Sequence, residues 1–148
     1  MDGSNQAVTQ LLERLLRAMN DHDLEGVVSC FADDYVNETP AHPDRGFQGL
    51  EQMRRNWTMI FGGVPDVRAQ VTRSAVDGDT VWTEWEMAGN RRDGAVFLSR
   101  GVMIFGIGDE VIRSVRFYME PVEQGAAGYD THTGRMVGSV AAADGARS

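Results

Sequence analysis

Cysteine is scarce in this sequence, which contains a single one, Cys30, among 148 residues. An internal disulfide and a cysteine-based zinc site are therefore both excluded. The apolar surroundings of Cys30, in the segment 27–31, favour a buried structural thiol over a reactive one. The three histidines are dispersed, without the local spacing of metal ligands, so we expect no metal site.

Basic residues are too few and too scattered for a nucleic-acid-binding protein. The chain has 14 Lys and Arg against 22 Asp and Glu, a net charge of −8, and no basic run. Nucleic acids are bound by clustered Lys and Arg that neutralise phosphates. We therefore expect no nucleic-acid partner.

Long apolar runs are missing as well. The first segment, 1–20, begins acidic and alternates apolar with polar side chains, which fits neither a signal peptide nor a membrane-spanning helix of ~20 apolar residues. From this we expect no membrane partner and a cytoplasmic location. Neither a Gly-rich phosphate loop nor a nucleophile elbow occurs, and we expect no cofactor.

The residues that are present have the composition of one globular domain, with 42% hydrophobic and 24% charged residues. Three segments, 6–19, 24–31 and 50–61, place apolar residues at spacings of three and four, which predicts three amphipathic helices. Asp21 or Asp23 is expected to cap the second helix, which should end at the acidic pair that follows it.

The second half of the sequence changes period. The segments 67–75, 80–88, 96–107 and 111–119 are rich in β-forming residues and are separated by short turn signals, which join antiparallel neighbours. A further short strand is expected at 35–39. The predicted fold class is α+β, with three N-terminal helices packed on a strongly curved antiparallel sheet that forms a cone with a hollow inside.

The C-terminal segment 124–148 is rich in Gly, Ala and Ser and lacks apolar periodicity. We expect it to be a disordered tail, so that the folded domain comprises residues 1–123.

Three segments carry a resemblance to a known family: 30–37 (CFADDYVN), 46–51 (GFQGLE) and 116–123 (RFYMEPVE). The sequence resembles the nuclear-transport-factor-2-like superfamily, and within it the SnoaL-like group. The resemblance implies a cone with one pocket, usually in a homodimer joined through the outer sheet face. Members of the superfamily include polyketide cyclases, ketosteroid isomerases and limonene-type epoxide hydrolases, and others bind ligands or proteins without chemistry.

The acids that those enzymes use have no counterpart in this sequence. The place of the isomerase base holds Thr39, and the second isomerase acid falls at Met103. The Arg and the two Asp of the epoxide hydrolases fall at Trp85, Met87 and Phe117, and the last of these is also the position of the cyclase acid.

Successive side chains of a strand point to opposite faces of the sheet, so two strand registers are possible and each predicts a different pocket. In the register that we prefer, apolar side chains face the hollow, namely Trp85, Met87, Met103, Phe105, Phe117 and Met119. In the other register the hollow is lined by Glu84, Glu86, Arg100, Arg116, Tyr118 and Glu120. The first register buries aromatic and Met side chains and lets the charges pair across strands or across a dimer. The second would create an acid–base site.

The preferred register predicts an apolar pocket with a polar edge. The predicted ligand-binding residues are Asn37, Thr39, Trp57, Trp85, Met87, Met103 and Phe117. The candidate catalytic residues are Tyr35, His42, Glu86 and Tyr118.

Two main functions remain open. The first is a cofactor-free cyclase, isomerase or hydrolase that acts on a hydrophobic, polyketide- or steroid-like metabolite. The second is a carrier, sensor or accessory subunit that binds an apolar small molecule without chemistry, which the replacement of the family's acids favours. A third is a protein-binding dimer module, which would need an exposed apolar patch.

Overall fold

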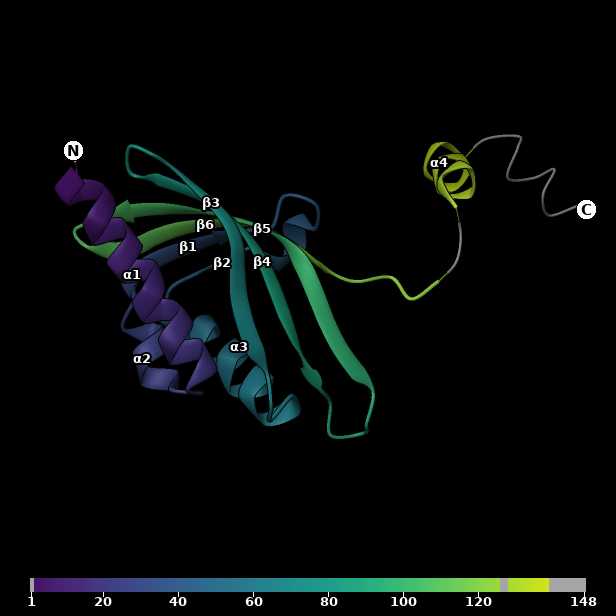
Figure 1. Ribbon diagram of the computed structural model, residues 1–148, viewed down its shortest axis with the longest axis horizontal. Helices are drawn as coiled ribbons and strands as arrows, with labels where there is room; N and C mark the ends of the chain where they lie inside the picture. Colours follow the sequence, from purple (N-terminus) through teal and green to yellow (C-terminus); the bar gives the residue numbers. More distant parts are fainter. Residues whose placement is uncertain (1, 126–127, 139–148) are drawn as a thin grey trace, which may run out of the picture.

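Three helices lie against one face of a curved, unclosed six-stranded sheet in this computed structural model, which describes residues 2–125 and 128–138 (Figure 1). The predicted α+β cone is confirmed. The helices are α1 (Asp2–Asn20), α2 (Leu24–Val28) and α3 (Leu50–Gly63), with a 3-10 turn, η1 (Pro43–Arg45). The strands are β1 (Phe31–Glu38), β2 (Phe47–Gln48), β3 (Arg68–Asp77), β4 (Thr80–Asn90), β5 (Val96–Gly108) and β6 (Val111–Pro121).

The sheet has the order β2-β1-β6-β5-β4-β3 and is mixed. The meander from β3 to β6 is antiparallel, as its short turns predict. The expectation of a wholly antiparallel sheet is wrong, because β1 runs parallel to β6, with Asn37 opposite Val115. A pairing between the first and the last strand leaves no local turn signal, so the sequence pattern does not reveal it.

The junction of α2 and β1 differs from the prediction. Asp23 caps α2 as expected, since its Oδ1 accepts from the Gly26 amide at 3.0 Å. The helix then ends at Val28, and the strand already begins at Phe31. The strand starts early because β6 pairs with this segment, and the Ile112 amide donates to the Cys30 carbonyl at 2.8 Å. Tertiary pairing here overrides the helical spacing.

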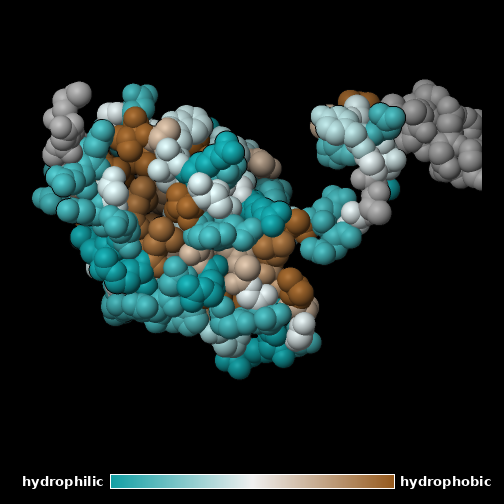
Figure 2. All heavy atoms as spheres, in the orientation of Figure 1, coloured by the Kyte–Doolittle hydropathy of each residue, from teal (hydrophilic) through white to brown (hydrophobic). Residues whose placement is uncertain are grey.

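The helical stripes and the inner face of the sheet form one core. On α1, Leu11, Leu15 and Met19 are buried, and they pack with inward-facing sheet residues such as Trp85 and Phe105. Figure 2 shows apolar side chains gathered along the seam between α1 and the sheet, within a largely hydrophilic surface. No helix of the described segments is long and apolar enough to span a membrane.

Gly101 allows β5 to cross the curved sheet closely beside β6. Its φ is +155°, and a Cβ at this position would collide with the carbonyl oxygen of Tyr118 on β6. Only glycine tolerates both the backbone conformation and this approach.

The segment after β6 contains a helix that the sequence pattern did not predict. Residues Tyr129–Val137 form α4, and Gly138 caps its C-terminus in the left-handed conformation. Tyr129 and Met136 on α4 are exposed. The remainder of the expected tail, 139–148, lies outside the described residues, and the domain boundary at 123 stays a prediction.

Candidate functional site

The hollow of the cone is a cavity of about 580 Å³ between α1, α3 and the inner face of the sheet. This volume lies within the range of typical small-molecule pockets, roughly 300–1,000 Å³. Its walls combine methionines with aromatic rings. The lining methionines are Met19, Met53, Met59, Met87, Met103 and Met119. The lining aromatic residues are Phe31, Tyr35, Phe47, Trp57, Phe97, Phe105 and Phe117.

The strand register is the one that we preferred from the sequence. Met87, Met103 and Phe117 line the cavity. Met103 and Phe117 are direct neighbours across β5 and β6, as the alternation requires. The charged residues of the same strands lie on the opposite face. Glu86 pairs there with Arg100, and Glu84 and Arg116 pair with residues of β3 and β1.

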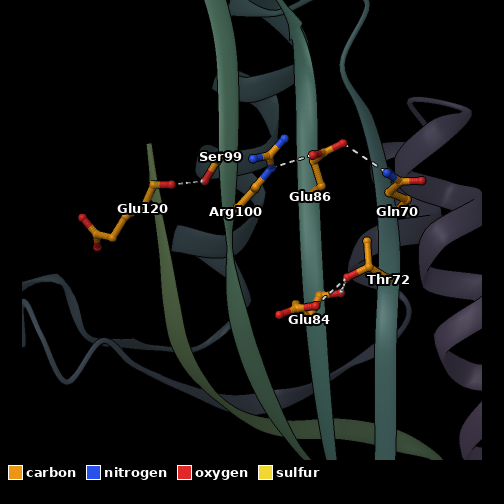
Figure 3. A network of polar contacts seen from close by, with 7 residues as sticks. All are labelled: Gln70, Thr72, Glu84, Glu86, Ser99, Arg100 and Glu120. Atoms are coloured by element: carbon orange, nitrogen blue, oxygen red, sulfur yellow. Dashed lines mark hydrogen bonds and ion pairs between the residues drawn. The ribbon is translucent and has the colours of Figure 1, made fainter. Parts of the chain in front are cut away.

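Figure 3 shows this outer network across β3, β4, β5 and β6. The Arg100 Nε donates to Glu86 at 2.7 Å, and the Gln70 amide donates to the other oxygen of Glu86 at 3.1 Å. The hydrogen bond from Arg100 holds the pKa of Glu86 below its ordinary value. Glu86 therefore stays ionised near neutral pH and lies away from the cavity.

The other two outer candidates for catalysis are also engaged outside the pocket. His42 lies just before η1, and its Nε2 is 3.0 Å from Oε2 of Glu120. Tyr118 is on the outer face of β6, where its hydroxyl accepts from Nη2 of Arg116 at 3.2 Å. Neither side chain lines the cavity.

Tyr35 is the candidate catalytic residue that the structure places in the pocket. Its side chain is 1% exposed, and its ring contacts Phe31 and Phe47 edge-on. The hydroxyl accepts a hydrogen bond from Nδ2 of Asn37 at 2.9 Å, and Oδ1 of Asn37 accepts from Thr39 at 3.2 Å. Burial raises the pKa of Tyr35 well above its ordinary value, so the hydroxyl keeps its proton.

Two residues of the predicted ligand set lie behind the pocket wall. Trp85 is fully buried, and its indole Nε1 donates to Thr83 Oγ1 at 2.6 Å, which in turn donates to the Met103 carbonyl at 2.6 Å. Thr39 is buried and supports Asn37 without lining the cavity. The other five predicted residues line it: Asn37, Trp57, Met87, Met103 and Phe117.

The sequence reasoning missed the residues at the open end of the pocket. This end, which we call the mouth, is formed by Met59 and Gly63 of α3 and by Arg91, which follows β4. Met59 is 67% exposed, whereas Tyr35 at the closed end is 1% exposed. Arg91 lies in a turn sequence. Its position at the mouth depends on the contact of this turn with α3, where the Arg92 amide donates to the Gly63 carbonyl.

The lining offers hydrogen bonds but little acid–base chemistry. Among the described residues that line the cavity there is no Asp, Glu, His or Lys. The described part of the chain also contains no group of three or more His, Cys, Asp or Glu side chains that could hold a metal ion. The arrangement can therefore enclose an apolar body and donate a hydrogen bond from Tyr35 to an acceptor.

Comparison with known proteins places this geometry in a family. The model of the SnoaL-like domain matches residues 12–115. No curated protein matches the chain.

Solved structures share the fold at low sequence identity. An LEH-like epoxide hydrolase of Mycobacterium tuberculosis is 21% identical, with a TM-score of 0.67 over 80% of this chain and 85% of that one. Protein RV0760c of the same organism, in complex with estradiol-17β-hemisuccinate, is 18% identical, with a TM-score of 0.65 over 76% and 92%. A protein of Catenulispora acidiphila with a ketosteroid isomerase-like fold, in complex with trimethylamine, is 18% identical, with a TM-score of 0.63 over 73% and 84%.

Proposed function

The chain belongs to the family of SnoaL-like domains, and we propose that it uses its cone to bind a largely apolar small molecule without acid–base catalysis. The observation that carries this proposal is the lining of the cavity. Methionine and aromatic side chains surround it, and the described lining residues include neither a carboxylate nor an imidazole. Similar folds bind small molecules, including the mycobacterial protein in complex with estradiol-17β-hemisuccinate.

The polar end of the pocket sets one requirement on the ligand. Asn37 donates to the Tyr35 hydroxyl, so the phenolic proton points to another acceptor. A buried donor without an acceptor is unfavourable by about 1–3 kcal/mol. We therefore propose that the ligand carries a carbonyl, ether or hydroxyl oxygen that accepts this hydrogen bond. A rigid steroid- or polyketide-like body fits the remaining apolar walls.

The catalytic alternative requires a proton-transfer group inside the pocket. Of the four candidate catalytic residues, Glu86, His42 and Tyr118 are held outside it by their own partners. Tyr35 alone can polarise an oxygen, but it keeps its proton and has no base beside it among the described lining residues. The geometry thus supports binding better than turnover by a cyclase, isomerase or hydrolase.

Binding of N-phenyl-1-naphthylamine, a neutral fluorescent aromatic compound, tests this proposal. We expect saturable 1:1 binding to the wild type and, for Phe117→Arg, affinity at least about tenfold lower, because apolar contact is lost and a charge must be desolvated. Tyr118→Arg is the matched control, since Tyr118 lies next in the chain and faces outward. No binding to the wild type, or equal losses in both variants, would refute the proposal. A thermal melt of each variant shows that it folds.

A homodimer through the outer sheet face is a further part of this proposal, and a cytoplasmic location remains a prediction from the sequence. Trp82 supports the dimer, because its side chain is on the outer face and 50% exposed. Across the sheet, Trp82 of β4 pairs with Ile104 of β5, and Ile104 pairs with Arg116 of β6. Sedimentation should show a dimer for the wild type and a monomer for Trp82→Arg. A wild-type monomer at all concentrations would exclude this assembly.

A further inference from the structure

One charged side chain lines the pocket, and it lies at the mouth. Of the described residues that surround the cavity, Arg91 is the single one with an ionised side chain, in a protein whose net charge is −8. We infer that Arg91 binds an anionic group of the ligand, so that the pocket selects an amphipathic molecule with an apolar body and an anionic end. This inference rests on the proposed function and specifies its ligand class.

Arg91 has the hydrogen-bonding capacity for this role. Its Nη2 donates to Asp93 Oδ2 at 2.7 Å, and Asp93 Oδ1 in turn accepts from the Ala95 amide at 3.0 Å. Asp93 thereby engages one nitrogen of the guanidinium group. A guanidinium has five N–H donors, and a carboxylate or sulfonate engages two of them. The side chain is 57% exposed, so the pair with Asp93 is a weak surface ion pair that leaves Arg91 available.

The neighbouring Arg92 has a different role. Its Nε donates to the carbonyl of Gly62, and its amide donates to the carbonyl of Gly63, both at the C-terminus of α3. Arg92 does not line the cavity. It attaches the turn to α3 and thereby fixes one side of the mouth.

The strand register places the two polar ends of the pocket far apart. Asn37 is opposite Val115, which pairs with Phe105, and Phe105 pairs with Val81 at the start of β4. Arg91 directly follows the other end of β4. A ligand that satisfies both ends is therefore elongated, with an acceptor oxygen near Tyr35 and its anionic group at the mouth.

A cationic ligand is the contrasting possibility. Aromatic faces attract cations, and the negative net charge of the protein would favour them over anions at long range. Fields beyond ~8 Å are largely screened at physiological ionic strength, however, so the nearest charge dominates at the mouth. Of the ion pair at the mouth, Arg91 lines the cavity and Asp93 does not, so a bound group contacts the guanidinium of Arg91, which repels a cation.

A matched pair of fluorescent probes tests the inference on the full chain. 8-Anilinonaphthalene-1-sulfonate has the aromatic body of N-phenyl-1-naphthylamine with an added sulfonate. We expect Arg91→Gln to weaken binding of the sulfonate probe about tenfold and to leave the neutral probe within about twofold of the wild type. Asp93→Asn removes a negative charge beside Arg91 and should tighten the sulfonate probe a few-fold. Arg73→Gln removes a positive charge from β3, away from the cavity, and should change neither affinity.

The possible outcomes separate the two proposals. If the neutral probe binds but Arg91→Gln affects both probes equally, or neither, the anionic end is refuted while the apolar pocket stands. The same conclusion follows if Asp93→Asn weakens the sulfonate probe, or if the wild type binds the neutral probe but not the sulfonate. If neither probe binds to the folded wild type, the proposed function itself fails. Rising salt should weaken the sulfonate probe in the wild type and have less effect in Arg91→Gln.

Discussion

Replacing Tyr35 with phenylalanine removes one hydroxyl group from the closed end of the pocket and leaves the ring in place. The edge-on contacts with Phe31 and Phe47, at centroid distances of 4.8 and 5.8 Å, do not involve the hydroxyl. Two hydrogen bonds are affected: the one that the Tyr35 hydroxyl accepts from Asn37, and the one that we propose it donates to the ligand. The first affects folding stability and the second affects ligand affinity, so the two can be measured separately.

The stability effect is the loss of one hydrogen bond at a half-buried amide. We expect Tyr35→Phe to lower the free energy of unfolding by about 1 kcal/mol. For a domain of this size that loss corresponds to a decrease in Tm of roughly 3–6 °C. Tyr118→Phe is the matched control, because the Tyr118 hydroxyl accepts from Arg116 on the exposed outer face.

The ligand effect is read from a ketone and its hydrocarbon analogue, 2-acetylnaphthalene and 2-ethylnaphthalene. A buried carbonyl that loses its donor is left unsatisfied, and we expect about tenfold weaker binding of the ketone, or ~1.4 kcal/mol. The hydrocarbon should bind equally to the wild type and to Tyr35→Phe. Competition with N-phenyl-1-naphthylamine fluorescence measures both affinities. Equal losses for the two compounds, or an equal effect of Tyr118→Phe, would show that Tyr35 does not donate to the ligand.

Two further variants test the outer face and the sheet. Glu86→Gln should leave ligand affinity unchanged, because Glu86 is on the outer face. The pKa of Glu86 is lowered in the folded state, so its contribution to stability is present above the unfolded pKa of about 4.3 and is lost as pH falls through the folded pKa. The wild type and the variant should therefore converge in stability in acid. A stability difference that grows as pH falls would contradict the pairing with Arg100. Gly101→Ala should destabilise the fold by at least about 2 kcal/mol in denaturant unfolding, since it combines an unfavourable φ with a collision against β6. Gly94→Ala, at a φ of +87° in open space, has no such collision and should be milder; equal effects would show that the collision is unimportant.

Local patterns in the sequence predicted the parts of the site that depend on alternation. Met87, Met103 and Phe117 were expected to face the hollow because a strand exposes every second side chain to one face, and they line the cavity. The same alternation predicted that Glu86 would face outward. Helical spacing likewise predicted α3, and with it the place of Trp57 in the pocket wall.

Contacts between distant segments could not be predicted from local sequence patterns. The parallel pairing of β1 with β6 begins β1 at Phe31 and so brings Phe31 into the pocket wall. Trp85 faces inward as predicted, but the bond of its indole to Thr83 and the surrounding core keep it behind the cavity surface. Arg91 lies in a polar turn, and its place at the mouth depends on how that turn meets the end of α3. Each of these depends on tertiary packing, which neither periodicity nor composition encodes locally.

The methionines of this protein are concentrated around the cavity, which makes it accessible to methyl NMR spectroscopy. The sequence has eight methionines, six of which line the pocket, the others being Met1 and Met136. Isotope labelling of the methionine methyl groups would therefore produce a small set of signals, most of which arise from the pocket. Thioether side chains adapt their rotamers to what they contact. Shifts of these signals on addition of a compound would map its position between the buried Met53 and the exposed Met59 at the mouth.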